Sequence, residues 1–146
     1  MNVFLKRPLI SIFFLLIGLR GTGQILSVDT ISTPELLVEN VLLGHGIQIS
    51  NVQFTGSPQS RGYFNGSNSN IGLGEGVILS TGRATDAEGP NGTPLSDLGT
   101  EFALPGDTAL TAISGSQFGT FDAAIIEFDF QSSSDSVYLR YVFASN

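Results

Sequence analysis

The chain contains no cysteine, no tryptophan and a single histidine, His45. The absence of cysteine excludes disulfides, and it also excludes an anchor attached through a lipidated N-terminal cysteine. A zinc site is disfavoured, because one histidine leaves only carboxylates as further ligands, and carboxylates suit harder cations. The fold is therefore expected to depend on its core or on a bound hard metal ion.

Basic residues are scarce, and half of them lie in the N-terminal segment. After residue 23 the chain has no lysine and only three arginines, Arg61, Arg83 and Arg140, against all 13 acidic residues, which leaves a net charge of −10. Nucleic-acid binding depends on clustered lysine and arginine, so this class of partner is excluded. An anionic membrane surface is disfavoured for the same reason. Divalent cations, cationic surfaces and neutral glycans remain as ligands.

The first 23 residues have the three parts of a cleaved secretory signal. Lys6 and Arg7 form a basic start, residues 9–19 form an apolar run, and small residues precede Gln24. The apolar run is shorter than the roughly 20 residues that span a bilayer, so a permanent anchor is the weaker alternative. We therefore expect residues 1–23 to be a signal peptide, and residues 24–146 to form one exported domain without stable membrane insertion.

One short helix is predicted near the start of this domain. Thr33 fits an N-cap, Pro34 fits the first helical position, and the apolar residues that follow predict a helix over residues 34–43. A second helix of one or two turns is predicted over residues 107–113, with Asp107 as its cap.

Most of the remaining pattern has a period of two, which is typical of strands. Strands are predicted at residues 46–55, 61–64 and 76–80, and a change of parity near Asn51 predicts a bulge in the first of them. The glycines at 72, 74 and 76 precede a strand rather than a helix, so they predict a turn and not a phosphate-binding loop. Many short strands and few helices favour an all-β fold, an antiparallel β-sandwich or jelly-roll-like domain.

The clearest alternation lies at residues 126–131 and 137–143. These two segments predict a tight hairpin, and the register that puts both apolar sets on one face places Glu127 opposite Arg140. If this edge lacked further strands, its exposed apolar residues would favour aggregation.

A long acidic stretch over residues 82–106 is typical of a surface loop, and it supplies the best candidates for metal ligands. Its oxygen-bearing residues are of the type that calcium binds, although their spacing does not fit an EF-hand. Two interpretations stand: a calcium site in a chain without disulfides, or a solvated acidic loop. The candidate ligands are Asp86, Glu88, Asn91, Asp97, Glu101 and Asp107.

Two known catalytic sequence patterns are matched only in part. Ser80 lacks the glycine that a nucleophile elbow carries two residues earlier. Glu127 and Asp129 match the first part of the E-x-D-x-x-E strand of laminarinase-like glycosidases, but Ser132 stands where retaining hydrolysis needs its second glutamate. The sequence therefore predicts no enzyme.

Several blocks of sequence, taken in order, resemble the choice-of-anchor L domain family. They include LLVENVLLGHG at 36–46, GVILSTG at 76–82, DAAIIEFDF at 122–130 and RYVFAS at 140–145. The resemblance implies an exported bacterial surface protein, of a kind common in Bacteroidota, without established enzymatic activity. It also implies that the domain is incomplete at Asn146 and that an anchor or sorting domain lies downstream.

The expected function is a secreted or outer-surface binding module, acting in adhesion or in binding an extracellular glycan or protein. The alternative is a noncatalytic carbohydrate-binding unit of a larger secreted enzyme. An exposed aromatic platform, for example Tyr63 or Tyr138 beside the acidic loop, would favour carbohydrate binding, whereas the absence of tryptophan counts against it.

Overall fold

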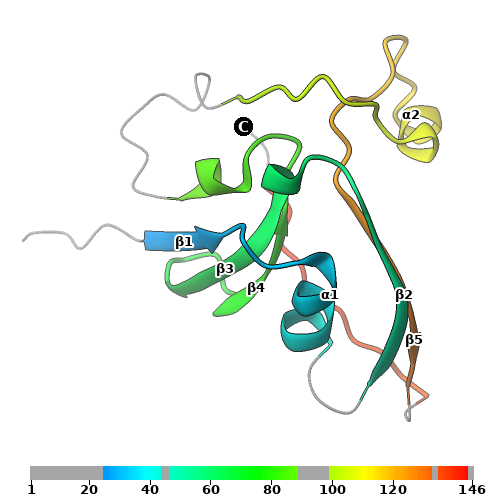
Figure 1. Cartoon of the computed structure of the whole chain (residues 1–146). Coiled ribbons are helices and arrows are strands. Elements are labelled where there is room, and N and C mark those ends of the chain that lie inside the picture. Colours follow the sequence, from blue (N-terminus) through cyan, green and yellow to red (C-terminus); the bar gives the residue numbers. More distant parts are fainter. Residues whose placement is uncertain (1–24, 44–46, 89–98, 133–134, 145–146) are drawn as a thin grey trace, which may run out of the picture.

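The computed structural model describes residues 25–43, 47–88, 99–132 and 135–144. These residues are mostly β-structure, in two antiparallel sheets with a few short helices (Figure 1). The elements in chain order are β1 (Ile25–Asp29), α1 (Pro34–Leu37), η1 (Val38–Leu42), β2 (Gln48–Thr55), η2 (Pro58–Ser60), β3 (Arg61–Asn68), β4 (Glu75–Leu79), η3 (Ala84–Ala87), α2 (Thr108–Ser114) and β5 (Ile125–Gln131). The signal peptide expected over residues 1–23 lies outside the described residues.

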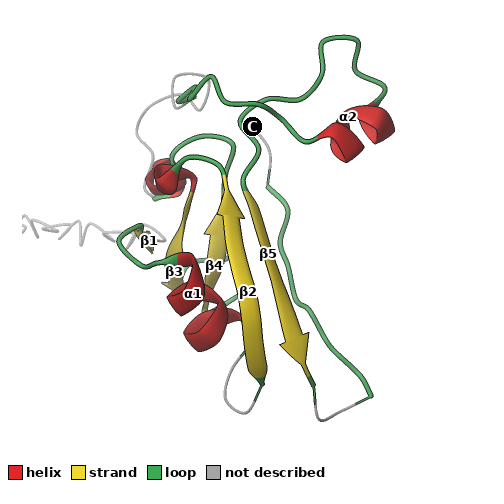
Figure 2. Ribbon diagram, turned by 45° about the vertical axis from the view of Figure 1, so that its right-hand side comes forward, coloured by secondary structure: helices red, strands yellow, loops and turns green. Residues whose placement is uncertain are grey.

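One sheet has the strand order β1-β3-β4, and the other contains β2 and β5 (Figure 2). In the first sheet β3 and β4 form a hairpin, and β1 pairs with the other edge of β3. Residues 69–74 join β3 to β4, which confirms that the glycine-rich stretch is a turn between strands. A jelly-roll-like sandwich of these sheets stays a prediction.

The helical segment between β1 and β2 contacts both sheets, with α1 against β2 and η1 against β4. The Thr33 hydroxyl accepts a hydrogen bond from the Leu36 amide at 3.4 Å, as an N-cap does. After one α-helical turn the segment widens into a π-helix, where the sequence alone predicted a continuous helix over residues 34–43. The adjacent residues Leu37 and Val38 are both fully buried, so this segment supplies the core between the sheets.

Arg61, the first residue of β3, joins this segment to both sheets. Its guanidinium lies 5.0 Å from the centre of the Phe54 ring on β2, and its Nη1 donates to the Ser32 carbonyl at 2.6 Å. Its Nε is buried without a hydrogen-bond partner among the described residues. The pKa of Glu35 is lowered, mainly by a hydrogen bond from its own backbone N–H and then by one from the Thr33 side chain. The positive charge of Arg61 lowers this pKa further. Arg61 is thus the polar group on which several elements converge.

The segment before β5 is held by a buried carboxylate. Asp122 is 8% exposed, and its oxygens accept hydrogen bonds from the amides of Phe102 and Leu104 at 3.1 and 2.7 Å. Two backbone bonds, from Asp122 to Leu104 and from Ala123 to Pro105, continue this contact. Because a buried charge is costly unless hydrogen bonds compensate it, Asp122 fixes the course of residues 102–105.

Helix α2 forms as its cap predicts. The Asp107 carboxylate accepts from the Leu110 amide at 2.7 Å, and Gly115 ends the helix with φ of 64°. None of its residues is buried, and Ile113 is 83% exposed. The helix lies away from the two sheets (Figure 1).

The predicted hairpin between residues 126–131 and 137–143 is wrong. The first segment forms β5 but pairs with β2, which sets Glu127 opposite Gln53 rather than opposite Arg140. The second segment forms no strand, and Arg140 Nη2 instead donates to the Gly72 carbonyl at 3.2 Å. The alternation of apolar and polar residues predicted the strand β5 correctly. Its partner β2 is distant in the chain, and a local sequence pattern cannot identify a distant partner strand.

We predict that Arg61→Ala lowers the free energy of unfolding by about 2–4 kcal/mol. The estimate combines one hydrogen bond to a charged group with one partly desolvated cation–π contact. Urea denaturation followed by circular dichroism measures the change.

Arg83→Ala is the matched control. Arg83 is exposed, and its Nε donates to Gln59 Oε1 at 3.1 Å. We expect a loss within about 0.5 kcal/mol, as for most surface substitutions. Equal losses for the two variants would contradict the role assigned to Arg61.

Candidate functional site

The outer face of the β2–β5 sheet is mostly polar. Alternation along both strands puts apolar residues such as Phe54 and Ile126 on the inner face and hydrogen-bonding side chains on the outer one. The apolar residue of this face is Ile125, opposite Thr55 at one end. The polar outer-face residues are Gln48, Ser50, Gln53, Thr55, Glu127, Asp129 and Gln131.

A β-bulge interrupts this face at its centre. The register shifts between the pairs Ser50–Asp129 and Gln53–Glu127, and Asn51 in the shifted stretch has φ of 53°. Asparagine tolerates this left-handed conformation better than most residues. The bulge predicted from the parity change is therefore confirmed, and such features occur frequently beside functional sites.

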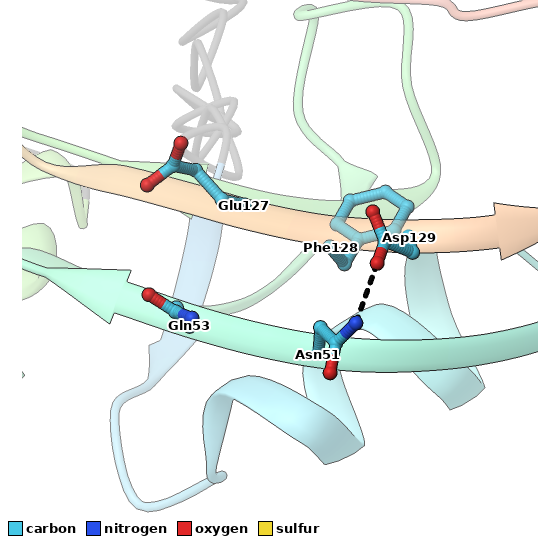
Figure 3. A pocket seen from close by; sticks show the side chains of 5 residues that line it. All are labelled: Asn51, Gln53, Glu127, Phe128 and Asp129. Atoms are coloured by element: carbon cyan, nitrogen blue, oxygen red, sulfur yellow. Dashed lines mark hydrogen bonds between the residues drawn. The ribbon is translucent and has the colours of Figure 1, made fainter.

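The bulge turns the Asn51 side chain across the sheet. Its Nδ2 donates to Asp129 Oδ2 at 2.6 Å, which joins β2 to β5 through side chains where the regular pairing is interrupted (Figure 3). This bond fixes one carboxylate oxygen of Asp129 and leaves the second oxygen for other donors.

A shallow depression of about 420 Å³ lies at the bulge. Figure 3 shows Gln53 and Glu127 on neighbouring strands at one end of it, and the bonded pair of Asn51 and Asp129 at the other. Phe128 is its fifth lining residue. The depression is a consequence of local backbone geometry, because the irregular pairing separates the two pairs of outer-face side chains.

The groups at this site are available to a ligand. Glu127 and Gln53 are exposed, and among the described residues their side chains have no hydrogen-bond or ion-pair partner. A carboxylate accepts hydrogen bonds, and a carboxamide both donates and accepts them. The arrangement can therefore bind hydroxyl or amine groups of a ligand in contact with the sheet.

The family model for the choice-of-anchor L domain matches residues 27–146. The chain belongs to the choice-of-anchor L domain family. No curated protein and no solved structure matches it. Membership of this family implies a surface-associated module of an exported protein.

Among the residues that the structure describes, this choice-of-anchor L domain has no helix with the length and apolar character needed to cross a membrane.

The acidic residues proposed as calcium ligands are engaged separately in the described part of the chain. Asp86 accepts from the Thr100 hydroxyl at 3.2 Å, Glu88 accepts from the Val28 amide at 2.6 Å, and Asp107 caps α2. Glu101 is exposed.

No group of three histidine, cysteine, aspartate or glutamate side chains suited to a metal occurs within residues 25–43, 47–88, 99–132 and 135–144. Asn91 and Asp97 lie outside the described residues, so calcium binding stays a prediction.

The two tyrosines considered for a carbohydrate platform belong to different parts of the chain, Tyr63 to β3 and Tyr138 to the segment after β5. The Tyr63 hydroxyl donates to Glu75 Oε2 at 2.8 Å, and this bond raises the pKa of Tyr63. Tyr138 is 92% exposed, in the segment that follows β5.

Sequence reasoning missed Asn51 and Gln53 as site residues. Near Asn51 the apolar residues of β2 move from odd to even positions. This change in the alternation predicted a bulge, but it did not identify a binding site. The partner strand is needed to show that this bulge lies opposite Glu127 and Asp129.

Thermal unfolding tests the calcium-site interpretation of the acidic loop directly. If the loop binds calcium, millimolar calcium raises the melting temperature of the exported chain above its value in EDTA, because a ligand that binds only the native state stabilises it. An unchanged melting temperature would reject calcium and leave the solvated acidic loop.

Proposed function

We propose that the exported domain is a binding module for adhesion or for capture of an extracellular ligand, and that the depression on the β2–β5 face contacts that ligand. The observation that carries the proposal is the bulge at Asn51, which holds Gln53, Glu127 and Asp129 around an exposed polar depression in a domain of a surface-associated family. The ligand is an extracellular glycan or protein at the cell surface or in the surrounding medium.

The charge of the domain supports a neutral or cationic ligand. Glu127 and Asp129 give the depression two carboxylates, and no arginine lines it. An anionic ligand would lose its hydration there without a compensating cation. Amide and carboxylate groups on one face also match the donors and acceptors of sugar hydroxyls.

We also propose that the domain performs no bond cleavage. Retaining glycoside hydrolysis requires a second carboxylate as nucleophile or acid, and Ser132 occupies the position where the related strand pattern has a glutamate. The depression is open and shallow, which suits recognition better than the exclusion of water that catalysis requires.

The alternative function is a noncatalytic carbohydrate-binding unit of a larger secreted enzyme. The same polar depression favours it, and the absence of tryptophan counts against it, because aromatic rings supply large apolar contact surfaces.

A double substitution tests whether the depression on the β2–β5 face binds the ligand. Gln53→Ala combined with Glu127→Gln removes one carboxamide and one charge, and we expect it to weaken binding to whole cells or to an immobilised glycan by about tenfold or more, because hydrogen bonds to charged groups contribute about 1.5–3 kcal/mol each. Adhesion assays and a glycan array measure the two ligand classes separately.

Gln48→Ala is the control on the same face. Gln48 is exposed and pairs with Gln131, beyond the bulge. This variant is expected to bind normally. Binding that survives the double substitution would move the ligand site elsewhere, and turnover of a β-glucan by the unmodified chain would refute the non-enzymatic proposal.

A further inference from the structure

The depression on the β2–β5 face carries two carboxylates and no positive charge. Glu127 and Asp129 are alternate residues of β5, so they lie on the same face with Cα atoms about 7 Å apart. Neither β2 nor β5 contains a lysine, arginine or histidine. Like charges at this separation repel each other, and a ligand that brings a positive charge removes the repulsion.

No arginine of the chain after residue 23 neutralises these two carboxylates, and no lysine occurs there. The three arginines each contact another part of the chain, with the partners Phe54, Gln59 and the Gly72 carbonyl for Arg61, Arg83 and Arg140 in turn. Among the described residues, the Glu127 carboxylate has no hydrogen-bond or ion-pair partner. We therefore expect the positive charge to come from the ligand.

The acceptor groups of the depression favour an ammonium over other cations. Calcium takes six to eight oxygen ligands, and the described ranges hold no group of three histidine, cysteine, aspartate or glutamate side chains suited to a metal. A guanidinium is a planar fork that matches both oxygens of one carboxylate, but the Asn51 amide already bonds to Asp129 Oδ2. An ammonium has three donors without a fixed fork, so it can bond to single oxygens of Glu127, Asp129 and Gln53.

The two ends of the depression indicate which kind of molecule carries the ammonium. Each end combines one carboxylate with one carboxamide, Glu127 with Gln53 at one end and Asp129 with Asn51 at the other (Figure 3). A sugar ring has hydroxyl groups around its edge, so a sugar unit with one amine can bond to both ends. A lysine ammonium ends an apolar stem, and four of the five lining residues offer that stem only polar groups.

We infer that the depression binds amino sugars, with the ligand ammonium at the carboxylates and the ring hydroxyls at the carboxamides. The inference rests on the proposed function, because it names the ligand class of that same site. The carboxylates of Glu127 and Asp129 select the charge, and the carboxamides of Asn51 and Gln53 recognise the sugar. A neutral sugar would desolvate two carboxylates without a positive charge to compensate them.

Two oligosaccharides that differ in charge test the inference. A glucosamine oligomer and an N-acetylglucosamine oligomer of equal length are titrated against the exported protein by calorimetry, at a pH that keeps the free amines protonated. We expect the glucosamine oligomer to bind about tenfold more tightly or better, from the size of hydrogen bonds to charged groups. Added salt is expected to reduce this preference. Equal dissociation constants overturn the inference.

Glu127→Gln keeps the shape of the side chain and removes its charge. We expect this variant to bind the glucosamine oligomer about tenfold more weakly and the N-acetylglucosamine oligomer unchanged. Glu39→Gln is the matched control, because Glu39 is an exposed carboxylate on η1, outside the depression. Equal losses in the two variants would mean that the net charge of the protein attracts the oligomer without a specific site, which overturns the inference.

A lysine-rich peptide distinguishes the other source of ammonium groups. If this peptide binds at the depression more tightly than the glucosamine oligomer does, the ligand is a protein and the inference is wrong. The double variant Gln53→Ala, Glu127→Gln separates this inference from the proposed function. If it loses binding to whole cells while the unmodified protein binds neither oligomer, the amino-sugar inference fails and the proposed function stands. Oligomer binding that persists in the double variant contradicts both.

Discussion

The contact of Arg61 with Phe54 and Ser32 is the constraint on which the arrangement of the two sheets depends. Arg61 begins β3, Phe54 lies near the end of β2, and Ser32 precedes α1, so one guanidinium reaches three parts of the chain. The apolar core is small, with only Leu37, Val38, Phe64 and Ala84 as buried hydrophobic residues in the described part of the chain. In a domain with so little apolar burial and no disulfide, a polar contact of this kind carries a larger share of the stability.

This arrangement leaves the outer face of β2 and β5 free for binding. The inner face packs toward α1 and Arg61, so the outer face can carry mostly polar side chains without cost to the core. The bulge at Asn51 then converts a flat polar face into a depression with carboxylates and carboxamides around it. Because the family is one of exported surface proteins, this depression supports the proposed recognition of an extracellular ligand.

Local patterns predicted much of the fold. The caps at Thr33 and Asp107, the bulge at Asn51 and the β3–β4 turn each depend on neighbouring residues, and each is found in the structure. The pairing of β2 with β5 could not be predicted, because the two strands are about 75 residues apart and tertiary contacts decide it. For the same reason the sequence paired Glu127 with Arg140, and it missed Gln53 as a site residue. The sequence also did not indicate that the Asp122 carboxylate holds residues 102–105 in place. Its hydrogen-bond partners are backbone amides, which every residue type except proline carries.

The most direct test of the central claim is a double-mutant cycle between Arg61→Ala and Phe54→Leu, measured by denaturant unfolding. If Arg61 joins the sheets through the Phe54 ring, the two losses are not additive, and the coupling free energy is about 0.5–2 kcal/mol. Losses that add within about 0.3 kcal/mol would show that the two side chains act independently. The sheets would then be held together by the helical segment alone, and the guanidinium would not be the group that joins them.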